Sequence, residues 1–158
     1  MDIYVDGSTH HQKNTGGFAV VTDDAVYIKA YGKAPKGYKR IGITYCETEA
    51  FIMGLELAKT GDCVNTDQCG IVTQIREQGQ YVSNRIRLGR SYCHSRRLDR
   101  VMAKKEGIAF DYYSSKTAKK KSPRHPANLA DMAAKVASET LQLNILQQYI
   151  GKRKVVLL

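Results

Sequence analysis

Short apolar runs separated by polar turns predict five β-strands along this chain. The runs are rich in Val, Ile, Tyr and Phe, which favour extended backbone. The pair Asp23-Asp24 separates the second run from the third, which indicates a tight hairpin. The expected strands cover residues 2–6, 18–21, 25–28, 63–66 and 108–113.

Residues 45–59 follow a helical pattern. Positions three, four, seven and eleven after Glu47 share its face of the helix and are Ala50, Phe51, Gly54 and Ala58. Because three of these residues are small, the face can lie close on a sheet, with Glu47 at its head pointing toward that sheet. Glu49 falls on a different row of the helix.

Three further helices are expected, and they complete the order β-β-β-α-β-α-α-β-α of an α/β fold. They cover residues 70–77, 90–106 and about 127–142. We find no internal repeat or linker, and 158 residues suit one domain with a sizeable core. We assign residues 1–142 to this domain and residues 143–158 to a C-terminal tail packed on it. The alternative for the tail is a docking strand or a segment that binds a partner.

The chain carries a net charge of +10, and this charge is unevenly distributed. Residues 85–105 hold eight Lys or Arg against one acid, and residues 116–124 hold five and no acid. Such a surplus favours acidic ligands, with nucleic acid ahead of a membrane surface. A solvated face is the alternative explanation of each run.

Targeting signals are not evident in the sequence. No apolar run approaches the roughly 20 residues that span a bilayer, and the start Met1-Asp2-Ile3-Tyr4 lacks the pattern of a signal peptide. The four cysteines form no C-x-x-C pair and are expected to be reduced thiols. We therefore expect a cytoplasmic monomer that does not act at a membrane.

Four carboxylates lie where local motifs would direct them to one place. They are Asp6 and Asp67 at strand ends, and Glu47 and Asp131 near helix starts. Buried like charges resist ionisation, so a fold that gathers them needs cations between them, and carboxylate oxygens suit Mg²⁺. In a basic protein such a pocket suggests chemistry on a phosphate backbone. A turn cap, a helix cap or a surface acid is the alternative for each residue.

Four stretches of this chain resemble, in order, the motifs of type 1 ribonuclease H. They are Tyr4-Val5-Asp6-Gly7-Ser8, the helix from Glu47 to Ala58, Asn65-Thr66-Asp67, and the stretch Asn128 to Ala133. The resemblance covers residues 2 to about 138. It implies a ribonuclease H-like fold, in which a five-stranded mixed sheet is flanked by helices. Strands one to three would be antiparallel, and strands four and five would be parallel.

The resemblance also implies a catalytic site that hydrolyses phosphodiesters with two Mg²⁺ ions, for which Mn²⁺ is a possible substitute. Asp6 would bridge both ions, Glu47 and Asp67 would complete one, and Asp131 would hold the other. His125, six residues before Asp131, is the candidate for the family's mobile histidine, with an ordinary loop residue as the alternative.

Nucleic-acid contacts are expected from the helix start and from the two basic runs. Thr44 stands in the stretch where the family has a hybrid-contacting Asn, and it can form one hydrogen bond there. Guanidinium groups match phosphate, so the first run suits the DNA strand of a hybrid. The further candidates are Arg85, Arg87, Arg90, Arg96, Arg97, Lys119, Lys120 and Lys121.

Three functions are compatible with these features. The first is an endonuclease that cuts the RNA strand of RNA/DNA hybrids. The second is a nuclease or resolvase of the same superfamily acting on DNA or structured RNA, which the altered stretch at residues 43–46 would fit. The third is a non-catalytic nucleic-acid-binding module, which would not need all four acids.

Overall fold

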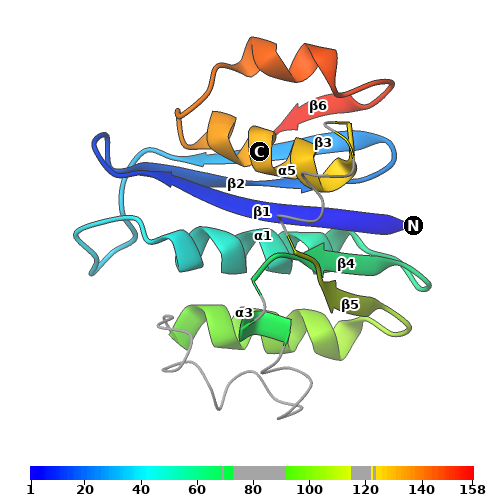
Figure 1. Ribbon diagram of the computed structural model, residues 1–158. Coiled ribbons are helices and arrows are strands. Elements are labelled where there is room, and N and C mark those ends of the chain that lie inside the picture. The colour runs from blue at the N-terminus through cyan, green and yellow to red at the C-terminus, as the bar shows by residue number, and fades with distance from the viewer. Residues whose placement is uncertain (69, 73–91, 115–121, 123) are drawn as a thin grey trace.

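The computed structural model shows a six-stranded mixed sheet with helices on both faces (Figure 1). It describes residues 1–68, 70–72, 92–114, 122 and 124–158. The strands lie in the order β5-β4-β1-β2-β3-β6. Their bounds are Asp2–His10 for β1, Thr15–Val21 for β2, Ala25–Tyr31 for β3, Cys63–Thr66 for β4, Ala109–Tyr112 for β5 and Lys154–Leu157 for β6.

The five predicted strands are present, with the predicted directions. Strand β1 pairs antiparallel with β2, and β2 with β3, whereas β4 runs parallel to both β1 and β5. β1 extends to His10, four residues beyond its predicted end, because β2 begins three residues earlier than expected and pairs with that extension. The longer β1 matters for the site, since it runs past the end of β4.

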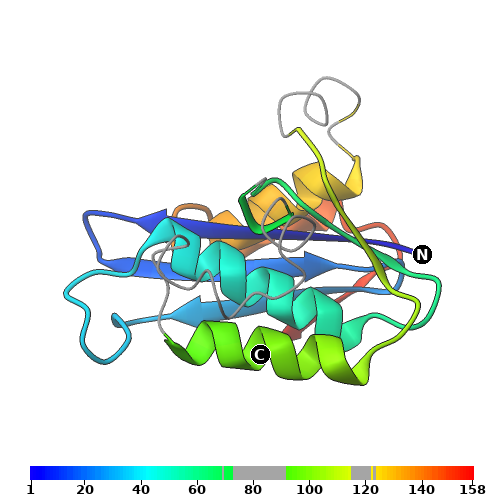
Figure 2. The ribbon, with the colours of Figure 1, turned by 90° about the horizontal axis from the view of Figure 1, so that it is seen from below.

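The helices divide between the two faces of the sheet (Figure 2). Helix α1, Ile43–Leu57, and helix α3, Tyr92–Lys104, cover one face, where their apolar residues share a core with Ile3, Val5 and Val64. Helix α5, Pro126–Ala137, and the 3₁₀ helix η2, Leu143–Gln148, cover the other. Of the helix predicted at 70–77, only 70–72 lie within the described residues, and these are helical.

Helix α5 ends earlier than its apolar pattern suggests. Glu139 has a φ of 65°, in the left-handed region, so the helix stops at Ala137 instead of continuing to 142. The chain then forms η2 and returns as β6, which pairs parallel with β3 along residues 25–28. The tail therefore adds a sixth strand to the five expected. The division of the chain at residue 142 stays a prediction.

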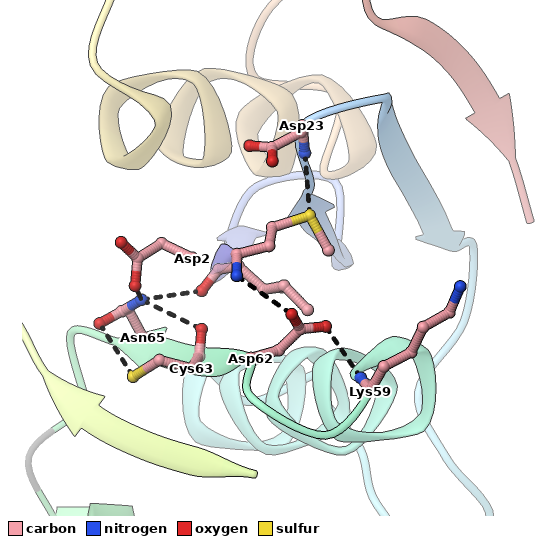
Figure 3. Close-up of polar contacts among 8 residues, drawn as sticks. Asp2, Asp23, Lys59, Asp62, Cys63 and Asn65 are labelled. Carbon is pink, nitrogen blue, oxygen red and sulfur yellow. Dashed lines mark hydrogen bonds and ion pairs between the residues drawn. The ribbon is translucent and has the colours of Figure 1, made fainter.

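Polar contacts at the start of β1 fix its register with β4 (Figure 3). The Asn65 amide donates to the Ile3 carbonyl oxygen at 3.2 Å and to an Asp2 carboxylate oxygen at 3.4 Å. The Asp62 carboxylate accepts from the Lys59 backbone N–H at 2.8 Å and forms an ion pair with the Met1 amino group at 3.1 Å. With this register, β4 ends opposite Val5, where Thr66 is the partner.

Helix α1 approaches the sheet closely at Gly54. A Cβ on this glycine would lie 2.7 Å from Val5 Cγ1 and 2.9 Å from Val64 Cγ1, so the space between helix and sheet is filled by the two valines. The small-residue face predicted from the sequence is thus the contact face.

Gly54→Ala is expected to destabilise the fold by about 1–2 kcal/mol. This is the difference between an overpacking cost of about 2–3 kcal/mol against β1 and β4 and a helix-propensity gain of about 1 kcal/mol. Gly32→Ala is the matched control, because nothing lies within 4 Å of its Cβ position. Urea unfolding of both variants measures the effect. Equal free energies of unfolding would show that the space between Gly54 and the two valines can accommodate a methyl group.

Candidate metal centre

Three carboxylates meet at the edge of β1. Oxygen atoms of Asp6, Glu47 and Asp67 all lie within 4.8 Å of one another. Asp6 belongs to β1, Glu47 is the fifth residue of α1, and Asp67 directly follows β4. Asp6 and Glu47 are only 4% and 5% exposed, whereas Asp67 is half-buried. Residues far apart in the sequence thus present acidic groups to one small volume.

The strand lengths explain why the carboxylates meet here. β4 ends opposite Val5, so the edge of β1 is no longer paired with β4 from Asp6 onward. Gly7 lies at this unpaired edge, and a Cβ on it would stand 2.5 Å from the Glu47 backbone nitrogen. Because Gly7 has no side chain, α1 touches β1 at Cys46 and Glu47, and Glu47 reaches the acids at that edge.

Asp131 approaches from the opposite face of the sheet, on α5. It hydrogen-bonds to Asp6, and its negative charge contributes to raising the pKa of Asp6. Its other polar contact is an ion pair with Lys135, one helical turn later, at 3.1 Å. The structure therefore brings all four predicted acids to one place, although only the first three form the tight group.

The cluster is electrostatically unfavourable without a counter-charge. Burial, followed by the charge of Asp67, raises the pKa of Asp6 to about 8. Burial and the charge of Asp6 raise the pKa of Glu47 well above its usual range. Asp6 and Glu47 also share a hydrogen bond, which requires one of the two carboxyl groups to keep a proton.

One oxygen of the cluster has no hydrogen-bond partner within the part of the chain that the structure describes. Glu47 Oε2 is fully buried, and among the described residues no group donates a hydrogen bond to it. An unsatisfied buried carboxylate oxygen costs free energy. A divalent cation would coordinate this oxygen and neutralise the neighbouring charges, so the donor set fits Mg²⁺ or Mn²⁺, which take oxygen ligands.

Tyr113 is a neighbour of the cluster that sequence reasoning missed. It follows β5, and its backbone N–H donates to the Thr66 carbonyl oxygen at 3.0 Å, next to Asp67. Its hydroxyl donates to the Val5 carbonyl oxygen at 3.4 Å. Burial and then the charge of Asp6 raise the pKa of this phenol. Its position directly after the strand that pairs with the Asp67 strand was the available signal.

His125 lies at the start of α5, near the cluster. Its Nδ1 accepts a hydrogen bond from the Ala127 backbone N–H at 3.1 Å, so it caps the helix. Its ring packs edge-on against Tyr4 with centroids 5.2 Å apart, and Tyr4 in turn contacts Tyr113. Capping is a structural role, which stabilises the start of the helix. A catalytic role for His125 stays a prediction.

Glu47 and Glu49 of α1 have separate environments. Arg97 Nη1 lies 2.7 and 2.8 Å from the two oxygens of Glu49, away from the acid cluster that Glu47 joins. The Arg97 side chain is 31% exposed, so part of it remains open to solvent. Thr44, also on α1, is half-buried, and its carbonyl oxygen accepts from the Thr48 hydroxyl at 2.7 Å.

The remaining predicted nucleic-acid contacts cannot be placed. The side chain of Arg96 is not described, and the other candidates lie outside the described residues. These are Arg85, Arg87, Arg90, Lys119, Lys120 and Lys121. Their role stays a prediction. Within the described residues, none of the helices has the length and apolar character required to cross a bilayer.

Comparison with known proteins places the fold. No protein-family model matches this chain, and no curated protein matches it in sequence. The solved structures include a similar one, the foamy viral protease-reverse transcriptase in complex with dsDNA. The similarity covers 89% of this chain and 94% of that chain, with a TM-score of 0.66 and 16% sequence identity. The predicted ribonuclease H-like α/β fold is confirmed, and it is shared with an enzyme that processes nucleic acid.

Proposed function

We propose that this protein is a metal-dependent endonuclease that hydrolyses the RNA strand of RNA/DNA hybrids. The observation that supports this most is the acid cluster with its unpartnered Glu47 oxygen. Because the acids disfavour each other's ionisation, bound cations would stabilise the cluster. Separately, a chain with a net charge of +10 suits a polyanionic substrate. The fold and the order of the four motifs are consistent with this activity.

Asp6, Glu47, Asp67 and Asp131 would hold the metal. When bound, Mg²⁺ would lower the pKa of an attacking water and stabilise the charge on the leaving oxygen. Asp6 is best placed to be shared, because Glu47, Asp67 and Asp131 all act on it. The Lys135 ammonium would hold Asp131 in position at the more exposed side of the cluster.

The surrounding residues would keep the cluster rigid and partly dry. Tyr113 covers the Val5–Asp6 segment from the β5 side, and Tyr4 packs between Tyr113 and His125. A rigid, water-poor setting strengthens interactions with a phosphate whose charge grows during the reaction. His125, which caps α5 and packs against Tyr4, would be the candidate to assist proton transfer or product release.

A second candidate is a nuclease or resolvase that acts on DNA or structured RNA. It is favoured by the stretch at residues 43–46, where Thr44 offers one hydroxyl in place of an amide, and the solved structure similar in fold was determined with dsDNA. A non-catalytic binding module is the third. It would show steep salt dependence of binding without cleavage.

Cleavage of labelled substrates separates these functions. The wild-type protein is expected to cut the RNA of a hybrid with Mg²⁺ or Mn²⁺ and not in EDTA. Asp67→Asn is expected to lower the rate at least about 100-fold, the scale of losing one preorganised electrostatic group. Asp24→Asn, the same change on the exposed β2–β3 hairpin, should retain the wild-type rate. Cleavage of duplex DNA with the hybrid left intact would reverse the ranking, and no metal-dependent cutting at all would support the binding module.

The pH dependence of stability tests the cluster without any substrate. The folded-state pKa of Asp6, about 8, is above the ordinary aspartate value near 4. Folded protein therefore holds a proton that the unfolded chain releases, so stability in EDTA should fall as pH rises from 4 through 8. Asp6→Asn should remove much of this slope, while Asp24→Asn should leave it unchanged. Chemical denaturation at pH 5 and pH 8 measures both.

Metal addition gives the complementary result. At pH 8, Mg²⁺ at ten times its dissociation constant should stabilise the wild type by about 1.4 kcal/mol. The same addition should have little effect on Asp6→Asn. Equal responses of the two proteins would show that Mg²⁺ binds elsewhere.

A further inference from the structure

A basic cavity lies on the α1 face of the sheet, outside the acid cluster. It has a volume of about 350 Å³ and is lined by residues 29–36, at the end of β3 and in the following loop, and by Tyr45 of α1. Lys29, Lys33 and Lys36 contribute to the wall, and no acidic side chain of the described residues lines it. Lys33 and Lys36 are exposed, so their ammonium groups are available to a ligand.

Two tyrosines give the cavity an ordered aromatic wall. The rings of Tyr31 and Tyr45 have centroids 5.6 Å apart and lie nearly perpendicular, and Tyr31 also packs against Phe18. Tyr45 hydrogen-bonds to Glu49. Since Arg97 already binds both oxygens of Glu49, the negative charge behind the wall is compensated. The cavity therefore has both an aromatic wall and three positively charged side chains.

Helix geometry places this cavity on the other side of α1 from the acid cluster. Tyr45 and Glu47 lie two residues apart near the start of α1, which separates their side chains by about 200° around the axis and about 3 Å along it. One residue lines the cavity and the other joins the acids. The two sites are therefore separated by about one helix diameter, roughly 10 Å. A nucleic-acid strand carries a phosphate about every 3.4 Å of helix axis, so a strand held at the acids has nucleotides within reach of the cavity.

A second basic cavity is less suited to a polyanion. It lies between α1 and α3, has a volume of about 270 Å³, and is lined by Arg97, Arg100 and Lys104. Glu56 also lines it, and Arg97 is engaged by Glu49. It contains no aromatic ring among its lining residues. Of these two cavities, only the one at Tyr45 is lined by lysines without an acidic side chain, and only it has aromatic rings in its wall.

We propose that the cavity formed by residues 29–36 and Tyr45 binds one nucleotide of a nucleic-acid strand, a few nucleotides away from the position that is cut. The three lysines contact the phosphates, and the Tyr45 ring packs against the sugar or base, a contact that tolerates any sequence. A volume of about 350 Å³ is within the range of small-ligand sites. The location of the cut rests on the proposed function, whereas binding of the strand does not.

Equilibrium binding in EDTA tests the lysines without cleavage. The probe is a fluorescein-labelled RNA/DNA hybrid, followed by anisotropy across a salt series. The triple variant Lys29→Gln, Lys33→Gln, Lys36→Gln is expected to bind at least about tenfold more weakly. Its plot of log affinity against log salt should be shallower by about 2, because each phosphate contact contributes 0.7–0.9 to that slope.

A matched triple variant controls for net charge. Lys59→Gln, Lys152→Gln, Lys154→Gln removes three exposed lysines at the opposite end of the sheet, where Lys154 pairs with Ala25. This control should bind within about twofold of wild type with little change of slope. If the two triple variants bind alike, the cavity is not a nucleic-acid site. Weaker binding of the first variant supports the site even if the cleavage assay fails, so the two proposals fail separately.

Tyr45 substitutions test the ring contact. Tyr45→Phe should bind the hybrid like wild type, and Tyr45→Ala about tenfold more weakly, since stacking is worth about 1–3 kcal/mol per base. Thermal unfolding of both variants shows whether the fold is intact, and the comparison is made at a temperature where both are folded. Equal binding by the Phe and Ala variants would overturn the ring contact.

Discussion

Mutual repulsion among buried carboxylates is the constraint around which this molecule is organised. Asp6 and Glu47 are almost fully buried, and burial raises the pKa of both carboxyl groups. The charge of Asp67 adds to this at Asp6, and the charge of Asp6 adds to it at Glu47. A protein core ordinarily excludes such a group of acids. Here three features hold the acids together: the register of the sheet, the edge of β1 that β4 leaves unpaired, and the close approach of α1 at Gly7. The fold therefore uses packing energy to keep an arrangement whose charges oppose it, as metal and catalytic centres do.

The helix α1 connects this centre to the rest of the α1 face. Its small face lies on β1 and β4, and Gly54 fixes the distance between helix and sheet. Near the N-terminal end of α1, Glu47 belongs to the acid cluster and Tyr45 lines the basic cavity. Since one rigid element carries both side chains, a tilt of the helix moves both sites together. Glu49, paired with Arg97, ties the same helix to α3.

Local patterns were sufficient for the strands, the packing face of α1 and the four acids. Glu47 was separable from Glu49 because the two occupy different rows of the helix, and the structure gives them different partners. The extension of β1, the pairing of β6 with β3 and the capping by His125 depend on contacts between distant segments, which periodicity does not report. Tyr113 and the lysine cavity were missed for the same reason, since neighbouring strands and loops assemble them.

Strand β6 determines what the outer border of the sheet presents to solvent. It is four residues long, begins with Lys154, and covers the first part of β3. Without it, the backbone N–H and C=O groups of seven-residue β3 would line that border, next to the exposed lysine loop. Long bare strands recruit other strands, whereas short, charged ones discourage such pairing. The C-terminal segment thus limits pairing of β3 with strands of other molecules, a task separate from any chemistry at the acid cluster.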